Sequence, residues 1–198
     1  MTSALDNCPF SGKAQPSALM NLALSPETRQ LRRQLSLYVP SGSAAELEAV
    51  RQLVDPMQSR LIPAHVTLCR EDEIGQLSVA ELQSRLSNGK LKPITLQFGQ
   101  PEAFSGHGIL LSCTGGQDGF QALREHILGS ASIRTLRPHI TLAHPRNPKA
   151  PGNSLASASG LPASLSITFG TICLIEQEGK EPWRLIQSFH LPEQSNEY

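Results

Sequence analysis

Two short segments of this chain carry a histidine and a threonine in the same order. The first reads His65-Val66-Thr67-Leu68 and the second reads His139-Ile140-Thr141-Leu142. Alternate side chains of a β-strand face the same side, so each segment, if extended, presents an imidazole and a hydroxyl on one face. The β-branched residue and the leucine occupy the opposite face, as a strand packed on a core requires. Such faces suit proton transfer and anion binding, because imidazole titrates near neutral pH and a hydroxyl donates a hydrogen bond.

The two segments belong to a longer internal repeat. Their histidines lie 74 residues apart, at positions 65 and 139, and the same offset aligns Leu35–Leu68 with Ile109–Leu142 without a gap. Within this stretch Arg60 falls on Arg134. A long self-match at one offset indicates two copies of one supersecondary unit. We interpret the unit as strand, helix, strand, with the His-x-Thr pair on the second strand.

With these motifs the chain resembles the 2H phosphoesterase superfamily, which includes the bacterial 2′-5′ RNA ligase-like proteins and the nucleotide cyclic phosphodiesterases. That superfamily is defined by two His-x-Thr/Ser motifs in two pseudo-symmetric lobes that flank one groove. The resemblance covers residues 32–192, and the run His139–Asn147 is similar to that of one broad branch of RNA-ligase-like members. It implies an α+β fold with two pseudo-symmetric lobes, each a small, mainly antiparallel sheet with outer helices, facing a central groove. The motif pair is specific for the superfamily and does not select a substrate.

The resemblance implies metal-independent cleavage of a 2′,3′-cyclic phosphate on a nucleotide or a short RNA end. His65 and His139 would supply the base that activates water and the acid that protonates the leaving ribose oxygen. Thr67 and Thr141 would donate to the non-bridging phosphate oxygens. The reverse reaction, 2′-5′ ligation, would use the same groups with exchanged roles, and no cofactor is expected. The repeat leaves open which histidine is the base, and we predict that His139 activates water.

Four further residues are candidate substrate ligands. Tyr38 lies on the non-core face of its expected strand and could stack on a base, and Ser112 is its mate in the repeat. Arg137 shares the face of His139 and could bind phosphate through two hydrogen bonds. A surface tyrosine and a solvated arginine are equally open interpretations. His144 lies at the opposite parity to His139, so a regular strand would turn it away from the ligand.

Two other functions compete with the phosphodiesterase. A non-catalytic nucleotide- or RNA-binding module could use the same fold, but both histidines and both threonines are intact, which favours an enzyme. A metal-dependent hydrolase using His65, His139 and His144 is disfavoured, because no carboxylate ligand lies near them in the sequence. The remaining histidines, His107, His126 and His190, are interpreted as structural or exposed.

The composition of the chain limits the classes of function that it can have. The chain has 198 residues, with 17 basic and 17 acidic side chains and a formal net charge of zero. This balance argues against a large basic surface for long duplex nucleic acid, although it leaves room for a local basic groove. The four scattered cysteines show neither a disulfide pattern nor a metal-binding spacing. No apolar run approaches the roughly 18 residues of a membrane span, and no signal peptide is evident, so we expect a cytoplasmic monomer.

The domain organisation follows from the repeat. We expect an N-terminal extension over residues 1–30, a single bilobal domain over 31–192 with repeat units near 33–70 and 107–144, and a polar tail over 193–198. The local patterns predict strands near residues 33–39, 65–70, 94–98, 101–104, 109–113, 137–143, 165–176 and 183–191. Helices are expected from a cap at Ser43 to Met57, from a cap at Ser78 to Asn88-Gly89, and from Phe120 to a stop at Gly129. Residues 145–162 are expected to form a long loop with one helical turn near 154–159.

Overall fold

The computed structural model describes residues 30–87 and 91–192. The strands are β1 (Leu31–Tyr38), β2 (His65–Cys69), β3 (Ile94–Phe104), β4 (Gly108–Gly115), β5 (His139–Ala143), β6 (Leu165–Phe169), β7 (Thr171–Glu178) and β8 (Arg184–His190). The helices are α1 (Ser41–Val54), α2 (Pro56–Leu61), α3 (Glu71–Ile74), α4 (Val79–Leu86), α5 (Gln117–Leu128) and α6 (Leu155–Ala158). No helix in these two described ranges is long and apolar enough to cross a bilayer.

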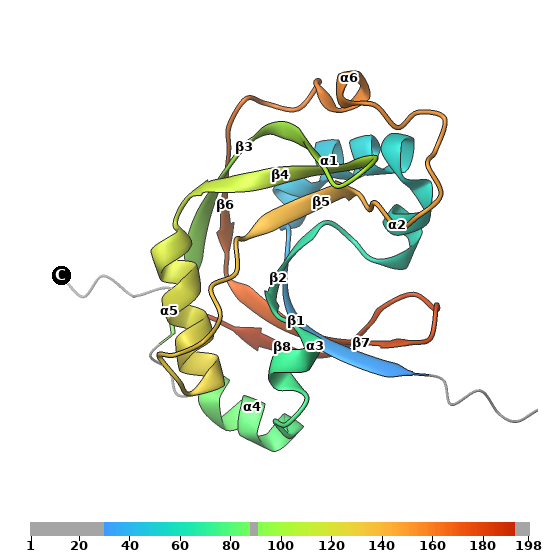
Figure 1. Ribbon diagram of the computed structural model, residues 1–198. Helices are drawn as coiled ribbons and strands as arrows, with labels where there is room; N and C mark the ends of the chain where they lie inside the picture. Colours follow the sequence, from blue (N-terminus) through green and yellow to red (C-terminus); the bar gives the residue numbers. More distant parts are fainter. Residues whose placement is uncertain (1–29, 88–90, 193–198) are drawn as a thin grey trace, which may run out of the picture.

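The strands form two four-stranded sheets in the described part of the chain, with orders β2-β1-β7-β8 and β5-β4-β3-β6 (Figure 1). Every pairing is antiparallel. The two orders correspond position by position, with each His-x-Thr strand, β2 or β5, at the edge of its sheet. This confirms the expected α+β fold with two pseudo-symmetric sheets. The internal repeat corresponds to β1-α1-β2 and β4-α5-β5.

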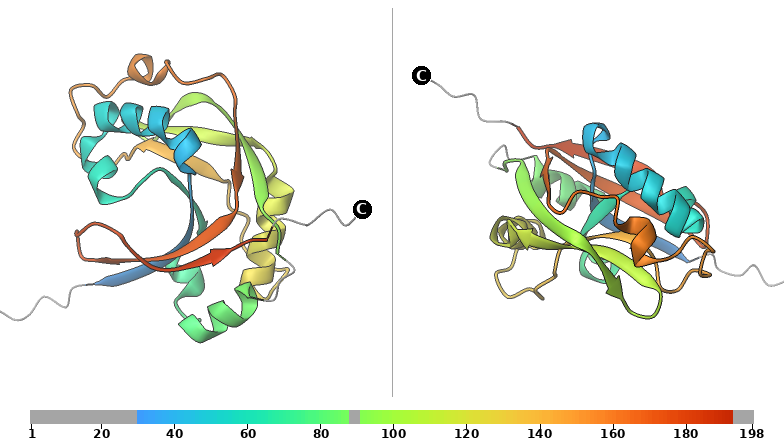
Figure 2. Two further views of the ribbon diagram at one scale, coloured as in Figure 1. Left: turned by 180° about the vertical axis from the view of Figure 1, so that it is seen from behind. Right: turned by 90° about the horizontal axis from the view of Figure 1, so that it is seen from above.

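The helix of each repeat contacts the motif strand of the other repeat. Helix α1 follows β1 of the first sheet but packs against β5 of the second, and α5, which follows β4, contacts β2 of the first sheet as well as β3 of its own (Figures 1 and 2). The two sheets therefore share one continuous apolar core. Its buried members from the motif strands and their neighbours are Leu35, Leu37, Val66, Leu68, Leu111, Ile140 and Leu142.

A buried arginine from α1 joins the two repeats. Arg51 is only 1% exposed. Its Nε donates to the carbonyl of Thr141 on β5 at 3.2 Å, and its Nη2 donates to the carbonyl of Ile62 at 2.7 Å. Its Nη1 forms an ion pair with Glu48 at 2.7 Å. Because β5 is an edge strand, part of its backbone lacks a neighbouring strand, and Arg51 satisfies one of these buried carbonyls.

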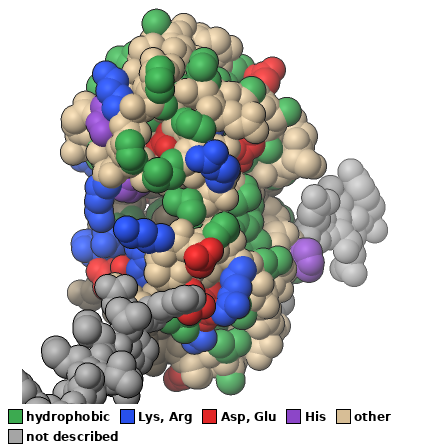
Figure 3. Space-filling model, turned by 90° about the vertical axis from the view of Figure 1, so that its right-hand side faces the viewer, with side chains coloured by type: hydrophobic (Ala, Val, Ile, Leu, Met, Phe, Trp, Pro, Cys, Tyr) green, Lys and Arg blue, Asp and Glu red, His purple; other side chains and the backbone are tan. Residues whose placement is uncertain are grey.

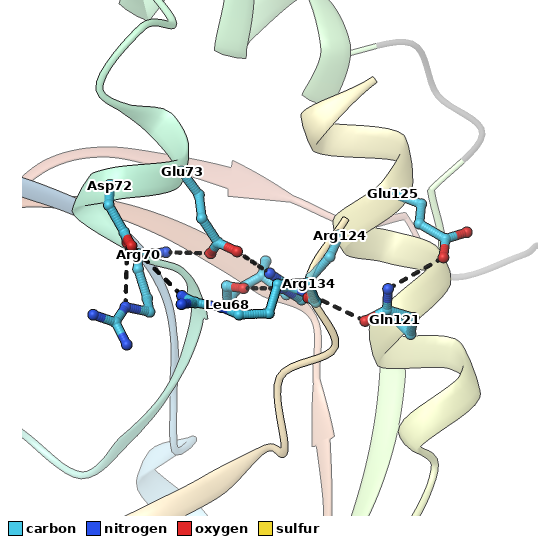
Figure 4. A network of polar contacts seen from close by, with 8 residues as sticks. All are labelled: Leu68, Arg70, Asp72, Glu73, Gln121, Arg124, Glu125 and Arg134. Atoms are coloured by element: carbon cyan, nitrogen blue, oxygen red, sulfur yellow. Dashed lines mark hydrogen bonds and ion pairs between the residues drawn. The ribbon is translucent and has the colours of Figure 1, made fainter. Parts of the chain in front are cut away.

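A second buried arginine does the same from α5. Arg124 is fully buried, and its Nε donates to the carbonyl of Leu68 on β2 at 2.9 Å. Its Nη1 donates to the carbonyl of Arg134 at 2.7 Å, and its Nη2 pairs with Glu73 of α3 (Figure 4). Each helix thus fixes the motif strand of the other repeat through one guanidinium group. Five donors in a rigid plane make arginine suited to hold several carbonyls at once.

The structure changes several sequence-based predictions. Residues 165–176 were expected to form one strand, but the chain breaks at Gly170, so that β6 joins the second sheet and β7 the first. Strand β6 alternates between buried and exposed residues, whereas β7 is buried along most of its length, and the single glycine between them is a weak signal for a change of sheet. Residues 94–104 form one strand, β3, whose pairing with β4 shifts register near Phe98, where a separate edge strand was expected at 101–104.

The prediction for the first helix was wrong at both ends. It begins at Ser41 after Pro40, so Ser43 is not its cap, and it ends at Val54 because Pro56 starts a separate helix. Met57 belongs to that second helix, α2, and is exposed. Helix α3 was not predicted at all, because four residues are too short to show a period.

Other signals are confirmed. Ser78 caps α4, Gly129 ends α5 in a left-handed conformation, and Ser154 caps the short helix α6 in the long loop. The structure also shows a hairpin between β7 and β8, in which Gly179 adopts a positive φ of 58°. The predicted helix stop at Asn88-Gly89, the extension up to residue 29 and the polar tail lie outside the described residues.

Replacing either buried arginine by methionine should strongly destabilise the fold. Arg51→Met leaves the carbonyls of Thr141 and Ile62 without this donor and Glu48 without its ion-pair partner. Arg124→Met likewise leaves two backbone carbonyls without a donor and Glu73 without its ion-pair partner. We expect each change to lower the free energy of unfolding by about 3–5 kcal/mol, measured by urea denaturation. The matched control is Arg60→Met, which removes an exposed guanidinium from α2. A loss no larger than that of the control would contradict the role given to the buried arginines.

Candidate active site

A cavity of about 390 Å³ lies where the two motif strands face each other, and His65, Thr67, His139 and Thr141 all line it. Each motif strand turns its histidine and its threonine toward the cavity, because alternate side chains of a strand lie on the same face. The residues between them, Val66 and Ile140, are buried in the core. The space-filling view shows a hollow beside which lysine and arginine side chains gather, with histidine close by (Figure 3). The tertiary structure therefore brings the two separate motifs of the sequence into one cavity.

The two motif histidines are oriented in the same way. Nδ1 of His65 lies 2.8 Å from the carbonyl oxygen of Pro63, and Nδ1 of His139 lies 3.0 Å from the carbonyl oxygen of Arg137. A carbonyl oxygen only accepts, so in both rings Nδ1 carries the hydrogen and donates it. Nε2 is then the atom of each ring that is left to take up or release a proton in the cavity.

The threonine hydroxyls are available to a ligand. Thr67 and Thr141 are half-buried in the cavity wall. Within residues 30–87 and 91–192, neither hydroxyl forms a hydrogen bond with another protein group. Two free donors on opposite strands can therefore bind the oxygens of one anion held between them.

Burial changes the acid–base chemistry of His65. It lowers the pKa of His65 to about 4, and the nearby positive charges of Arg51 and of His139 act in the same direction. The hydrogen bond to Pro63 opposes this shift without cancelling it. His65 is therefore neutral at pH 7, with a lone pair on Nε2.

His144 also lines the cavity, although a regular strand would have turned it away. Strand β5 ends at Ala143, so the parity rule no longer applies to the next residue. The ring accepts at Nδ1 from the backbone N–H of Arg146, at 3.2 Å, and its hydrogen is therefore on Nε2. Burial lowers the pKa of His144, and the positive charge of Arg146 lowers it further. The neutral ring can donate to a ligand only through Nε2.

A buried carboxylate holds the segment that carries His144 and Arg146. Asp55 is only 2% exposed and lies at the junction of α1 and α2. Its Oδ2 accepts from the backbone N–H of His144 at 2.9 Å and from the side-chain amide of Asn147 at 2.9 Å. Its Oδ1 accepts from the backbone N–H of Gln58 at 2.9 Å, which caps α2. One carboxylate therefore links the start of α2 to the loop after the second motif.

The other three candidate ligands lie outside the cavity lining. Tyr38 packs edge-on against His65, with ring centroids 6.2 Å apart, and burial raises the pKa of its phenol to about 12. Ser112 lies opposite His139 in the sheet, but its hydroxyl donates to Glu102. The side chain of Arg137 is exposed. Tyr38 thus contacts His65 from the neighbouring strand, and Arg137 accepts the Nδ1 hydrogen bond of His139 through its carbonyl. Direct ligand contact by Tyr38, Ser112 or Arg137 stays a prediction.

Several cavity residues escaped the sequence analysis. They are Arg32, Gln34, Gln58, Arg146, Asn147, Gln177 and Trp183. Arg32 and Gln34 lie on the same face of β1 as Ser36, so the alternation of that strand could have predicted that they face away from the core. The others lie on helices, loops or distant strands, and only the folded chain brings them together.

The remaining histidines lie away from the cavity lining. His107 bonds to the backbone of Asn147, His126 to that of Arg85, and His190 to the hydroxyl of Thr171. Across the described ranges, no three histidine, cysteine, aspartate or glutamate side chains lie close enough to hold a metal ion. The alternative site built from His65, His139 and His144 is therefore not assembled as a metal-ligand set.

Comparisons with known proteins place this geometry in a family. A family model for the 2′-5′ RNA ligase superfamily matches residues 39–181. The structure of E. coli LigT complexed with ATP is 16% identical, has a TM-score of 0.54, and covers 82% of this chain and 98% of its own. TT0787 of Thermus thermophilus is 18% identical, with a TM-score of 0.51 and coverage of 81% and 97%. These two likenesses establish the fold. No curated protein sequence matches the chain.

Asp55→Asn should loosen the loop that carries His144. An amide nitrogen would replace one of the two acceptor oxygens and face a backbone N–H, so we expect the free energy of unfolding to fall by about 1–3 kcal/mol. The backbone amide of His144 should also exchange its hydrogen faster. Hydrogen exchange and urea denaturation measure the two effects. Asp72→Asn is the control, because its side chain is 53% exposed. Unchanged protection at His144 would refute the role of Asp55.

His65 should make the stability depend on pH. The pKa in the folded state, about 4, lies below the ordinary value of 6.5, so between these values the unfolded chain binds more protons. The free energy of unfolding should therefore fall as the pH drops from about 6.5 to about 4. His65→Gln should show a smaller fall, because this variant lacks the titrating ring. Urea denaturation near both pH values and an NMR titration of the His65 ring provide the test. A ring that titrates near 6.5 would contradict it.

Proposed function

The chain belongs to the 2′-5′ RNA ligase superfamily, and we propose that it is a metal-independent phosphodiesterase that hydrolyses 2′,3′-cyclic phosphates of nucleotides or RNA ends. One observation carries this proposal. Two histidines on opposite strands face one cavity, and among residues 30–87 and 91–192 neither their Nε2 atoms nor the accompanying threonine hydroxyls have a hydrogen-bond partner. An acid and a base on opposite sides of a phosphorus atom are what an in-line displacement at phosphate requires.

We assign the base to His65 and the acid to His139. The low pKa keeps His65 neutral, so its Nε2 can accept a proton from the attacking water. The water oxygen bonds to phosphorus while the bond from phosphorus to one ribose oxygen breaks. His139 then protonates that oxygen from its Nε2. This assignment reverses the prediction from the sequence, in which His139 activated the water, because the repeat did not show that Arg51 and burial act on His65.

The other lining groups suit an anion. In the described part of the chain, none of the residues that line the cavity is an aspartate or a glutamate. Thr67 and Thr141 would hold the non-bridging oxygens of the scissile phosphate, and His144 and Arg146 would add donors from the loop held by Asp55. Fixed donors in a cavity partly shielded from water stabilise developing negative charge strongly. E. coli LigT was solved as a complex with ATP, which supports a nucleotide as the class of ligand.

The same groups would support 2′-5′ ligation, in which a 5′-hydroxyl takes the place of water at the cyclic phosphate. His65 would accept the proton of that hydroxyl and His139 would protonate the leaving ribose oxygen, so in this direction the two histidines would keep their roles, whereas the sequence analysis expected them to be exchanged. Three further expectations stay predictions: a single bilobal domain over residues 31–192, a monomeric state and a cytoplasmic location. That the protein does not act on long duplex nucleic acid also stays a prediction.

Turnover of 2′,3′-cyclic nucleotides and of a short RNA with a 2′,3′-cyclic end, both with EDTA present, tests the proposal. His65→Ala and His139→Ala should each lower kcat by about 10²–10⁴-fold, because each removes one proton-transfer group. Thr67→Val and Thr141→Val should each cost about 10²–10³-fold, because each removes one donor to the phosphate. The position of the phosphate in the product gives the regiochemistry.

His190→Ala provides the matched control for the two histidine variants, because this ring lies on β8 and bonds only to Thr171 among the described residues. It should retain the activity of the parent chain. Activity that survives both His65→Ala and His139→Ala would overturn the mechanism. Loss of turnover on addition of EDTA would point to a metal-dependent reaction instead. Nucleotide binding without turnover would favour a binding module.

A further inference from the structure

Three donor side chains lie together in the cavity beside the four motif residues. Arg32, His144 and Arg146 all line it. The positive charges of both arginines lower the pKa of His144, which places the two guanidinium groups near one imidazole ring. Arg32 reaches this ring from β1, whereas His144 and Arg146 belong to the loop after β5. Proton transfer in the proposed reaction requires none of the three.

Arg146 and His144 have hydrogen-bond donors that no described protein group accepts. The guanidinium of Arg146 forms neither a hydrogen bond nor an ion pair with any residue in the ranges 30–87 and 91–192. Its backbone N–H donates to Nδ1 of His144 at 3.2 Å, so the ring keeps its own hydrogen on Nε2. Within the same ranges that Nε2–H has no acceptor. Both groups line the cavity, and they are therefore open to an acceptor on a ligand.

Arg32 is held in place but is not neutralised. Its guanidinium lies over the ring of Trp183, 5.4 Å from the centroid, and its Nη2 donates to the side-chain oxygen of Gln177 on β7. The carboxylate of Glu71 is 3.9 Å from Nε, and both side chains are partly exposed to water, where such a long ion pair is weak. A guanidinium has five N–H donors, so Arg32 keeps both donors and charge for a ligand.

Two separate contacts fix the loop that carries His144 and Arg146. Asp55, which is 2% exposed, accepts hydrogen bonds from the backbone N–H of His144 and from the side-chain amide of Asn147, each at 2.9 Å. Nε2 of His107, in the hairpin between β3 and β4, lies 2.8 Å from the carbonyl oxygen of Asn147. The segment 144–147 is therefore in place before a ligand arrives, which lowers the entropic cost of binding there.

The positive charge in the cavity exceeds what one cyclic phosphate can balance. In the proposed reaction the acid, His139, carries one positive charge, and a 2′,3′-cyclic phosphate carries one negative charge. His65 is neutral at pH 7, because burial lowers its pKa to about 4. Arg32 and Arg146 then have no counter-ion in the cavity lining, which contains no carboxylate among the described residues. A second phosphate would balance them, since a phosphate monoester carries a charge of about −1.5 to −2 at pH 7.

We infer that Arg32, His144 and Arg146 form a second anion subsite, which binds the phosphate on the 5′ side of the nucleotide whose 2′,3′-cyclic phosphate is cleaved. This inference rests on the proposed function and narrows its substrate to cyclic phosphates that carry a second phosphate group, either the 5′-monoester of a nucleotide or the diester of an RNA end. His144 lies three positions beyond Thr141, roughly 10 Å along an extended chain at about 3.3 Å per residue. The two phosphates that flank one ribose are closer than this, and the long side chains of the arginines reach across the difference.

Kinetics on matched substrates test the subsite. Turnover is compared for 2′,3′-cyclic AMP, for its 5′-phosphorylated form, and for an adenosine dinucleotide with a 2′,3′-cyclic end. The same dinucleotide with an uncharged methylphosphonate linkage separates the effect of the charge from that of the added nucleoside. We expect kcat/KM to be about 10- to 150-fold higher with the second charge than without it, the usual value of one hydrogen bond to a charged group. A preference for the 5′-monoester alone would assign the subsite to mononucleotides, and a preference for the charged dinucleotide alone would assign it to RNA ends.

Matched variants show whether Arg146 carries the preference. Arg146→Gln should remove most of the ratio between the two kcat/KM values, because an amide supplies no charge, and Arg146→Lys should retain part of it. Arg60→Gln is the control, because it removes an exposed guanidinium from α2 that does not line the cavity. It should keep the preference of the parent chain. A preference that persists in Arg146→Gln, or that falls equally in Arg60→Gln, would overturn the inference.

Calorimetry tests the subsite without using turnover. The full-length chain is titrated with adenosine 3′-monophosphate and with adenosine 3′,5′-bisphosphate, which share the base and differ in the 5′-phosphate. The bisphosphate should bind about 10- to 150-fold more tightly, and this difference should shrink in Arg146→Gln. Equal affinities would disprove the subsite.

The outcomes separate the inference from the proposed function. Turnover of all four substrates with equal efficiency would disprove the subsite and leave the phosphodiesterase intact. Tighter binding of the bisphosphate without turnover of any substrate would support the subsite and contradict the enzyme.

Discussion

The candidate site depends on two buried guanidinium groups. Each His-x-Thr strand lies at the edge of its sheet, where part of the backbone has no neighbouring strand, and each receives one arginine from the helix of the other repeat. Arg51 holds the carbonyl of Thr141 and Arg124 holds that of Leu68. These contacts fix the distance and orientation of the two motifs. They also make the halves interdependent, since neither repeat can complete its own motif strand.

One of these arginines also acts on the chemistry of a motif histidine. Both rings are oriented by the carbonyl two residues before them, a local interaction that the repeat preserves. Arg51 is also close enough to His65 to lower its pKa, in addition to the effect of burial. The low pKa of His65 therefore comes from the packing around its motif and not from the motif itself.

The rest of the cavity is built from segments that the motifs do not specify. Asp55, at the break between two helices, positions the loop that carries His144 and Arg146. The β7–β8 hairpin brings Trp183 to the end of α2, where it meets Arg32 from the first strand. The motif strands thus supply the reacting groups, while the surrounding loops and the hairpin shape the space in which a ligand would lie.

The sequence by itself determined the internal repeat, most of the strands and longer helices, and the face on which each histidine and threonine lies. These depend on local alternation and on turn residues such as Gly129, which act over a few positions. Only the tertiary structure decided that the chain changes sheets at Gly170, that His144 turns into the cavity, and that Asp55, Arg32 and Trp183 take part in the site. Such features arise from contacts between segments up to 151 residues apart, as for Arg32 and Trp183, and no local pattern records them.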